Sequence, residues 1–193
     1  LIACNSCKLV QLRHDFDLGQ LYGHDYGYRS GLNESMCAHL AEIVEHVTAR
    51  TQLVAGDTVL DIGSNDATLL KCYQNSGLNR WGVDPSAEQF RAFYPDDIAA
   101  LPRLFDADEF LDAAGDKAKI ITSIAMFYDL PDPNSFVSGI ARSLRMDGIW
   151  LLEQSYLPTM IKQNAYDTIC HEHLEYYGLG PLSDLMQRHG LKV

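Results

Sequence analysis

The most informative part of the chain is Val59-Leu60-Asp61-Ile62-Gly63-Ser64-Asn65-Asp66-Ala67. The short apolar run from Thr58 to Ile62 predicts a buried strand, and Gly63 predicts a tight turn that leads into a helix. A glycine at this turn lets the backbone pass close to a ligand, because a side chain there would block the approach. The stretch is therefore typical of a strand–turn–helix unit that binds a cofactor.

Asp84 closes the next expected strand, 21 residues after Gly63. An acidic residue at that spacing is placed to accept hydrogen bonds from ribose hydroxyls. The expected cofactor contacts are Asp61, Gly63, Ser64, Asn65, Asp84 and Pro85.

The charges near the turn favour one of two cofactor classes. A dinucleotide carries a pyrophosphate, which favours three glycines and an uncluttered helix N-terminus. Here the turn has one firm glycine, and Asp66 stands close to where a phosphate would lie. S-adenosylmethionine has no phosphate and carries a cationic sulfonium and an ammonium group, which suit Asp61 and Asp66. The residues therefore favour S-adenosylmethionine over NAD.

Strands of continuous apolar character alternate with amphipathic helices along the chain. This pattern predicts an α/β domain in which helices cover both faces of a parallel sheet. The expected strands are 58–62, 81–84, 119–124 and 148–153, with a weaker one near 101–105. The expected helices are 33–50, 69–75, 86–93 with Ser86 as its N-cap, 134–144, 158–163 and 181–189. A tyrosine- and glycine-rich segment, 21–31, is expected to be irregular.

The composition limits the classes of partner and the cellular location that can be expected. The chain has 193 residues and a formal net charge of −11, which repels phosphate backbones and anionic membranes and disfavours a nucleic-acid partner. No apolar run reaches the roughly 18 residues that span a bilayer, and the first residues do not form a signal peptide. Five cysteines in a scattered arrangement favour a reducing cytoplasm over a disulfide framework. Both ends look cut, which predicts a fragment of a longer protein.

Four motifs resemble those of the sugar C-methyltransferases, in the same order along the chain. They are Cys4-x-x-Cys7-x-Leu9-Val10-Gln11-Leu12, Tyr26-x-Tyr28-x-Ser30-Gly31, Asp61-Ile62-Gly63-Ser64-Asn65-Asp66, and Tyr166-Asp167-Thr168-Ile169-Cys170-His171-Glu172-His173-Leu174-x-Tyr176-Tyr177. That family uses S-adenosylmethionine to methylate nucleotide-linked 4-keto deoxysugars in antibiotic and polysaccharide pathways. The resemblance implies the end of a zinc-type module with the tyrosine-rich segment (1–32), a Rossmann-like class I methyltransferase domain (33–155) and the start of a substrate domain (156–193).

The block from Cys170 to His173 suggests how such a reaction would proceed. Methylation of a carbon beside a ketone needs a base that removes a C–H proton and a group that stabilises the enolate. Histidine suits the first task because it titrates near neutrality. By resemblance, His173 matches the family's general base and Glu172 its acidic partner. Substrate contacts are expected from Tyr26, Tyr28, Cys170 and His171.

Two positions depart from the family pattern. Cys170 stands where the better-known members have a tyrosine, which leaves the substrate and the methylated position open. The loop from Ala125 to Leu130 has neither the Asn nor the His of many members. If that histidine helps to stabilise the enolate in relatives, Tyr128 or Asp129 must act differently here, and neither is assigned a catalytic role.

A metal site is an alternative interpretation of Cys170-His171-Glu172-His173. Neighbours in an extended chain point opposite ways, so four consecutive residues cannot all face one ion. The spacing also differs from the His-Glu-x-x-His signature of zinc proteases. Cys4 and Cys7 are half of a zinc site, and the family places the other pair upstream. Zinc is therefore expected in the full-length protein, and absent or only weakly held in this chain.

Three further interpretations stay open on sequence grounds. The same fold could carry a nicotinamide-dependent oxidoreductase or epimerase, or a cofactor-binding scaffold that has lost catalysis. The histidines of the final block could also do no more than satisfy hydrogen bonds in a loop.

Overall fold

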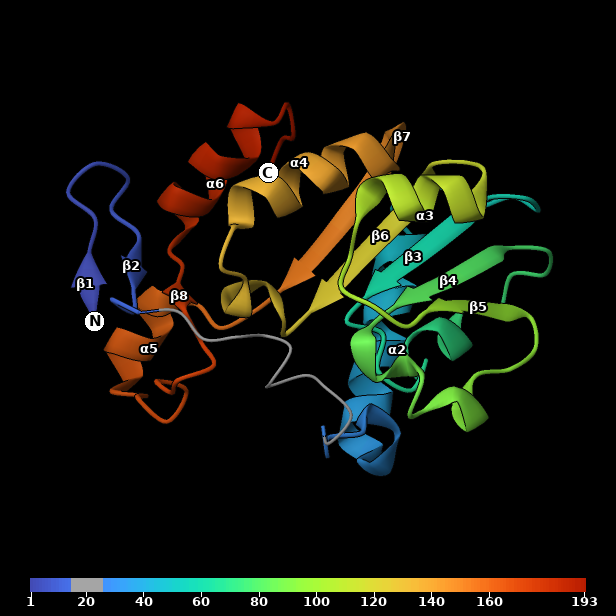
Figure 1. The fold of residues 1–193 in the computed structure, drawn as a ribbon, viewed down its shortest axis with the longest axis horizontal. Helices are drawn as coiled ribbons and strands as arrows, with labels where there is room; N and C mark the ends of the chain where they lie inside the picture. The colour runs from blue at the N-terminus through green and yellow to red at the C-terminus, as the bar shows by residue number, and fades with distance from the viewer. Residues whose placement is uncertain (15–25) are drawn as a thin grey trace. The chain divides into compact units, whose positions relative to one another are not determined.

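The computed structural model describes residues 1–14 and 26–193, and these form two compact units (Figure 1). The described residues of one unit are Tyr26–Ser123 and Arg142–Leu151, and those of the other are Leu1–His14, Ile124–Ala141 and Leu152–Val193. The units interleave along the chain, whereas the division into 1–32, 33–155 and 156–193 expected from the sequence is sequential and stays a prediction.

A five-stranded sheet forms the centre of the first unit. Its strands are β3 (Thr58–Ile62), β4 (Asn79–Val83), β5 (Ile98–Leu101), β6 (Ala118–Ile124) and β7 (Leu144–Glu153), in the spatial order β5-β4-β3-β6-β7. The pairs β3–β4, β3–β6 and β4–β5 are parallel, and the arrow of β7 points the same way as that of β6 (Figure 1). The order of strands reverses at β3, which is where open α/β sheets bind their ligands.

Burial explains why the central strand reads as a continuous apolar run. All five residues of β3 are buried, because β3 lies between β4 and β6 and both faces of the sheet are covered by other elements. Helix α2 (Glu34–Thr48), capped by the Asn33 side chain, buries one stripe of residues, and α3 (Ala107–Ala114), capped by Asp106, buries another. Figure 1 shows α3 in front of the sheet and α2 behind it. The predicted α/β class is confirmed; α3 was not predicted.

Two expected helices are wrong. The segment 69–75 forms only a 3-10 turn, η2 (Leu70–Cys72), and the segment 86–93 forms two, η3 (Pro85–Ala87) and η4 (Arg91–Phe93). Polar side chains beside these segments accept hydrogen bonds from the backbone and so compete with a regular helix. In η3 the N-cap is Asp84 and not the expected Ser86. The weak strand expected near 101–105 lies earlier, at Ile98–Leu101.

The second unit contains a small antiparallel sheet that the sequence pattern did not predict. It pairs β1 (Ile2–Ala3) with β2 (Val10–Gln11), and β2 with β8 (Glu175–Tyr176). The unit also holds η5 (Phe127–Asp129), α5 (Leu157–Gln163), α6 (Leu179–Arg188) and most of α4 (Pro133–Ser143). Among the described residues, no helix combines the length and the apolar character that a membrane crossing requires.

Candidate active site

The loop after β3 is held in an unusual backbone conformation. Gly63 has φ 79°, and the non-glycine residues Asn65 and Ala67 have φ 49° and 61°. Such angles cost an ordinary residue about 1 kcal/mol or more, so the surrounding bonds must hold them in place. The Gly63 amide donates to the Val83 carbonyl at 2.9 Å. Gly63 itself is exposed, which leaves its backbone open to a ligand.

Asp84 links this loop to the end of β4. Its Oδ2 accepts from the Asn65 amide at 2.8 Å, and its Oδ1 accepts from the Ser86 amide and hydroxyl at 2.7 and 2.6 Å. A carboxylate offers about four acceptor positions, so these three bonds leave room for one more donor such as a ribose hydroxyl. Pro85 follows as the first residue of η3 and is partly exposed.

The Ser64 side chain points into the domain. Its hydroxyl lies 2.8 Å from that of Tyr94, and the Tyr94 hydroxyl also donates to the Asn65 carbonyl at 2.9 Å. Gly82 makes this packing possible, because a Cβ there would lie 2.6 Å from the Ser64 Oγ. Ser64 therefore has only its backbone to offer a cofactor. Tyr94 and Gly82 are supporting residues that the sequence analysis missed.

The Asn65 side chain joins the tyrosine-rich segment to the loop after β3 through two hydrogen bonds. Its Oδ1 accepts from the Ser30 amide at 2.9 Å, and its Nδ2 donates to the Tyr28 carbonyl at 3.0 Å. The rings of Tyr26 and Tyr28 lie 6.4 Å apart, and Tyr28 is 48% exposed. The tyrosine-rich segment is thus attached to the predicted cofactor loop. Tyr22, in the same segment, lies outside the described residues.

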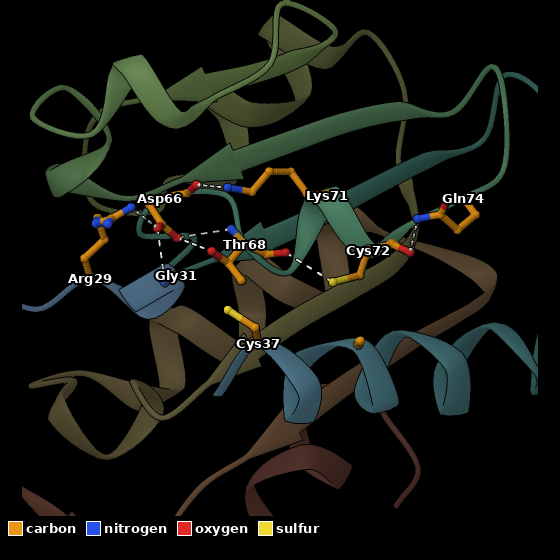
Figure 2. A pocket seen from close by; sticks show the side chains of 9 residues that line it. Arg29, Gly31, Cys37, Asp66, Thr68, Lys71, Cys72 and Gln74 are labelled. Carbon is orange, nitrogen blue, oxygen red and sulfur yellow. Dashed lines mark hydrogen bonds and ion pairs between the residues drawn. The ribbon is translucent and has the colours of Figure 1, made fainter. Parts of the chain in front are cut away.

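Asp66 is fully buried and its charge is balanced within the domain. Its Oδ2 accepts from Arg29 at 3.3 Å and from the Gly31 amide at 3.1 Å, while its Oδ1 accepts from the Thr68 hydroxyl at 2.5 Å. Figure 2 shows Arg29, Gly31 and Thr68 meeting at Asp66. These four residues are among those that line a cavity of about 530 Å³. The Asp66 carboxylate is thus already paired with Arg29, and its expected attraction to a cationic cofactor stays a prediction.

Asp61 is the other acid expected to attract a cationic cofactor. It is buried near the end of β3, and its Oδ1 accepts from the Thr122 hydroxyl of β6 at 2.6 Å. The pKa of Asp61 is raised to about 7, chiefly by burial and also by the negative charge of Asp84, while the hydrogen bond from Thr122 opposes the rise. Two acidic side chains thus influence each other beside the open Gly63 turn, and a cationic ligand would relieve their repulsion.

In the other unit, His173 is held by a backbone carbonyl. Its Nδ1 lies 2.6 Å from the Thr168 oxygen, and its ring centroid lies 4.3 Å from that of Tyr128. A carbonyl can only accept, so this bond places the proton on Nδ1 and leaves the Nε2 lone pair available. The ring is partly exposed. Thr168, which holds it, was not singled out from the sequence.

The other members of the block are more exposed. Glu172 and His171 are exposed, and Cys170 is partly exposed, with its Sγ 3.8 Å from the Glu172 Oε2. The contact shown by Glu172 is thus with Cys170, whereas Thr168 orients the His173 ring. Leu174, next in the chain, donates its amide to the Tyr128 carbonyl at 2.8 Å and so joins the block to η5.

Two buried carboxyl groups, Asp129 of η5 and Glu175 of β8, influence each other electrostatically. Asp129 and Glu175 are 3% and 7% exposed, and burial raises the pKa of Glu175 to about 8, with a further contribution from the Asp129 charge. At neutral pH the Glu175 carboxyl therefore keeps its proton. Asp129, whose role the sequence left open, is a partner of this acid.

Cys4 and Cys7 lie on a tight turn between β1 and β2, where Lys8 donates its amide to the Cys4 carbonyl at 3.0 Å. Hydrogen bonds from the backbone of Cys7 and Ser6 lower the pKa of the Cys4 thiol, which favours the thiolate that zinc requires. Two thiols supply half of the four ligands of a closed zinc site. They fit zinc only with further ligands.

Comparisons with known proteins show the family to which the chain belongs. Residues 28–193 match the family described as "Methyltransferase domain", and the chain belongs to that family. The C-methyltransferase NovU of Streptomyces niveus is 31% identical over 195 residues, which cover 100% of this chain and 46% of NovU. The chain therefore spans about half the length of that curated relative.

Solved structures show the same fold. A Haloferax volcanii putative methyltransferase in complex with the activator Trm112 matches with a TM-score of 0.65 and 23% identity, over 84% of this chain and 74% of the other. S-adenosylmethionine-bound CalS10, an amino pentose methyltransferase from Micromonospora echinaspora, matches with a TM-score of 0.52 and 17% identity, over 67% and 55% of the two chains. The expected Rossmann-like class I methyltransferase fold is confirmed.

Proposed function

We propose that this domain binds S-adenosylmethionine over Gly63 to Asn65, and that the protein methylates a carbon of a nucleotide-linked keto-sugar. The observation that carries the first part is the pair of carboxyl groups, Asp61 and Asp84, beside the exposed Gly63 backbone. A pyrophosphate would meet these acids unfavourably, whereas a sulfonium and an ammonium would be attracted. When bound, S-adenosylmethionine supplies an electrophilic methyl group.

The residues divide the work of binding. The Asp84 carboxylate has one acceptor position left for a ribose hydroxyl, and the backbone at Gly63 and Ser64 lies against the cofactor. The segment from Tyr26 to Ser30, attached through Asn65, covers the site and brings tyrosine hydroxyls to the substrate. Membership of the methyltransferase family supports this assignment over a nicotinamide-dependent oxidoreductase.

His173 is the proposed base. Its Nδ1 is engaged by the Thr168 carbonyl, so its Nε2 can take the proton from the carbon beside the ketone. The exposed Glu172 accepts a hydrogen bond from a sugar hydroxyl, and Cys170 and His171 of the same block contact the substrate. The name of NovU, a C-methyltransferase, supports carbon as the acceptor, and the amino pentose substrate class of CalS10 supports a sugar.

Two measurements test the two parts separately. Calorimetry with S-adenosylhomocysteine and with NAD should show binding of the first and none of the second; the reverse would contradict the cofactor assignment. Incubation of a nucleotide-linked 4-keto deoxysugar in D₂O should place deuterium beside the ketone, and His173→Gln should abolish this exchange. Exchange that persists in His173→Gln would rule out His173 as the base and leave the cofactor result intact.

A further inference from the structure

Three metal-ligating side chains converge in the loop before β8. A ring nitrogen of His173, the Cys170 Sγ and a carboxylate oxygen of Glu172 all lie within 4.8 Å of one another. The Sγ and the Glu172 Oε2 are 3.8 Å apart. Within residues 1–14 and 26–193, these are the side chains that gather in this way.

The backbone explains how three of four consecutive residues can face one point. An extended chain would send Cys170 and Glu172 to one side and His173 to the other. Here residues 170–172 form bends, so the strict alternation is lost and His173 turns toward the other two. His171 is exposed and lies outside the cluster. Three of the four consecutive residues therefore face one point.

The chemistry of the three donors fits zinc. Thiolate, imidazole and carboxylate are its usual ligands, at roughly 2.0–2.3 Å from the metal, and tetrahedral geometry then sets them about 3.3–3.8 Å apart. The contact between Cys170 and Glu172 already has that length. Both side chains have exposed surface, so small rotations can close the remaining distances.

The surroundings of His173 resemble those of a zinc-bound histidine. Histidines that ligate zinc donate their other ring N–H to a carbonyl or carboxylate, which fixes the tautomer and the ring. The Thr168 carbonyl, 2.6 Å from Nδ1, provides this partner and leaves Nε2 as the nitrogen that can bind a metal. Thr168 itself lies outside the cluster of three donors.

We propose that Cys170, Glu172 and His173 bind a zinc ion and leave its fourth position open. Three protein ligands with one open position is the pattern of sites that admit water or a substrate oxygen. The effect on catalysis rests on the proposed function: Nε2 cannot hold zinc and accept a substrate proton at once, so zinc would inhibit methyl transfer.

Cobalt(II) titration tests the site without any assay of activity. Co²⁺ reports thiolate ligation through a charge-transfer absorption and tetrahedral geometry through visible bands, and zinc displaces it because zinc binds such sites more tightly. The titration is done on Cys4→Ser/Cys7→Ser protein kept reduced, so that the other thiol pair makes no contribution. We expect one Co²⁺ per chain, with both signals, displaced by one equivalent of zinc.

Further variants of that protein identify the ligands. Cys170→Ser should abolish the charge-transfer band, and His173→Gln should weaken binding by more than about 100-fold, since loss of second-shell groups alone costs 10–100-fold. Cys72→Ser, which removes a thiol outside the cluster, should change neither. Absence of the band in Cys4→Ser/Cys7→Ser protein, or its persistence in Cys170→Ser protein with native circular dichroism, would overturn the proposal. Neither outcome depends on whether the protein methylates a sugar.

Discussion

The Asn65 amide donates to the Asp84 Oδ2 at 2.8 Å, so the turn after β3 is tied to the residue expected to hold the cofactor ribose. Asp84→Asn keeps the size of the side chain but removes its charge and one acceptor. Because hydrogen bonds to charged groups contribute about 1.5–3 kcal/mol, we predict that affinity for S-adenosylhomocysteine falls roughly 10- to 100-fold by calorimetry. Asp112→Asn, at an exposed position on α3, is the matched control and should bind normally. Equal affinities of the two variants would contradict the assignment of Asp84.

Asp61 predicts that binding of S-adenosylmethionine depends on pH. Its pKa of about 7 means that the carboxylate, which attracts the cationic cofactor, disappears as the pH falls below 7. Affinity should therefore rise about tenfold per pH unit up to roughly pH 7 and level off above it. Calorimetry across this range measures the profile.

Two variants separate Asp61 from other titrating groups. Asp61→Asn should make the affinity profile flat in this region. Thr122→Val removes the bond that lowers the Asp61 pKa, so the midpoint should move to higher pH. An unchanged profile in Asp61→Asn would show that another group is responsible.

Local patterns were sufficient to predict the central part of the fold. The strand β3, the turn at Gly63 and the long helix α2 were predicted because their apolar periods agree with their burial in the structure. The segments after Asp66 and Asp84 were mispredicted as helices for a common reason. Each aspartate accepts from the backbone amide two residues on, a local competition that apolar periodicity does not report.

The residues that support the candidate site could be predicted less well. The bond between Arg29 and Asp66 joins residues 37 apart in the sequence, and nothing in either motif specifies the partner. Thr168 is five residues from His173, but its carbonyl reaches the ring only because of the bends between them. The small sheet rests on β2 and β8, strands of two residues each, too short to show a period.

Glu175 predicts how stability changes with pH. The folded protein keeps a proton on this carboxyl up to about pH 8, whereas the unfolded chain releases it near the ordinary value of 4.5. The folded state thus binds more protons between these values, and the free energy of unfolding should fall as the pH rises through this interval. Glu175→Gln should remove this loss and be the more stable protein above about pH 8.

Urea unfolding of wild type and Glu175→Gln from about pH 5 to pH 9 provides the measurement. Asp61 contributes a change of the same sign up to about pH 7, so the difference between the two proteins isolates Glu175. Glu42→Gln, at an exposed position of α2, is the control and should follow wild type. A Glu175→Gln curve parallel to that of wild type would show that Glu175 titrates normally.

We predict that any side chain at position 31 destabilises the fold, because Gly31 lies where the tyrosine-rich segment contacts Asp66. A Cβ at Gly31 would lie 2.5 Å from the Asp66 Oδ2 and 2.9 Å from the Thr68 Oγ1. Both neighbours are buried and bonded to each other, as Figure 2 shows, so they cannot move aside cheaply. Gly31→Ala should lower the free energy of unfolding by about 1–3 kcal/mol, the usual cost of overpacking.

The matched control is Gly27→Ala, since a Cβ at Gly27 meets nothing within 4 Å. It should leave stability nearly unchanged, as surface substitutions usually do. Gly31→Ala should also weaken the bonds that Asn65 makes to the segment, and trypsin should then cleave after Arg29 faster than in wild type or Gly27→Ala. If both variants unfold and are cleaved like wild type, the segment is not held against Asp66, and its proposed role as a cover over the cofactor loses its structural basis.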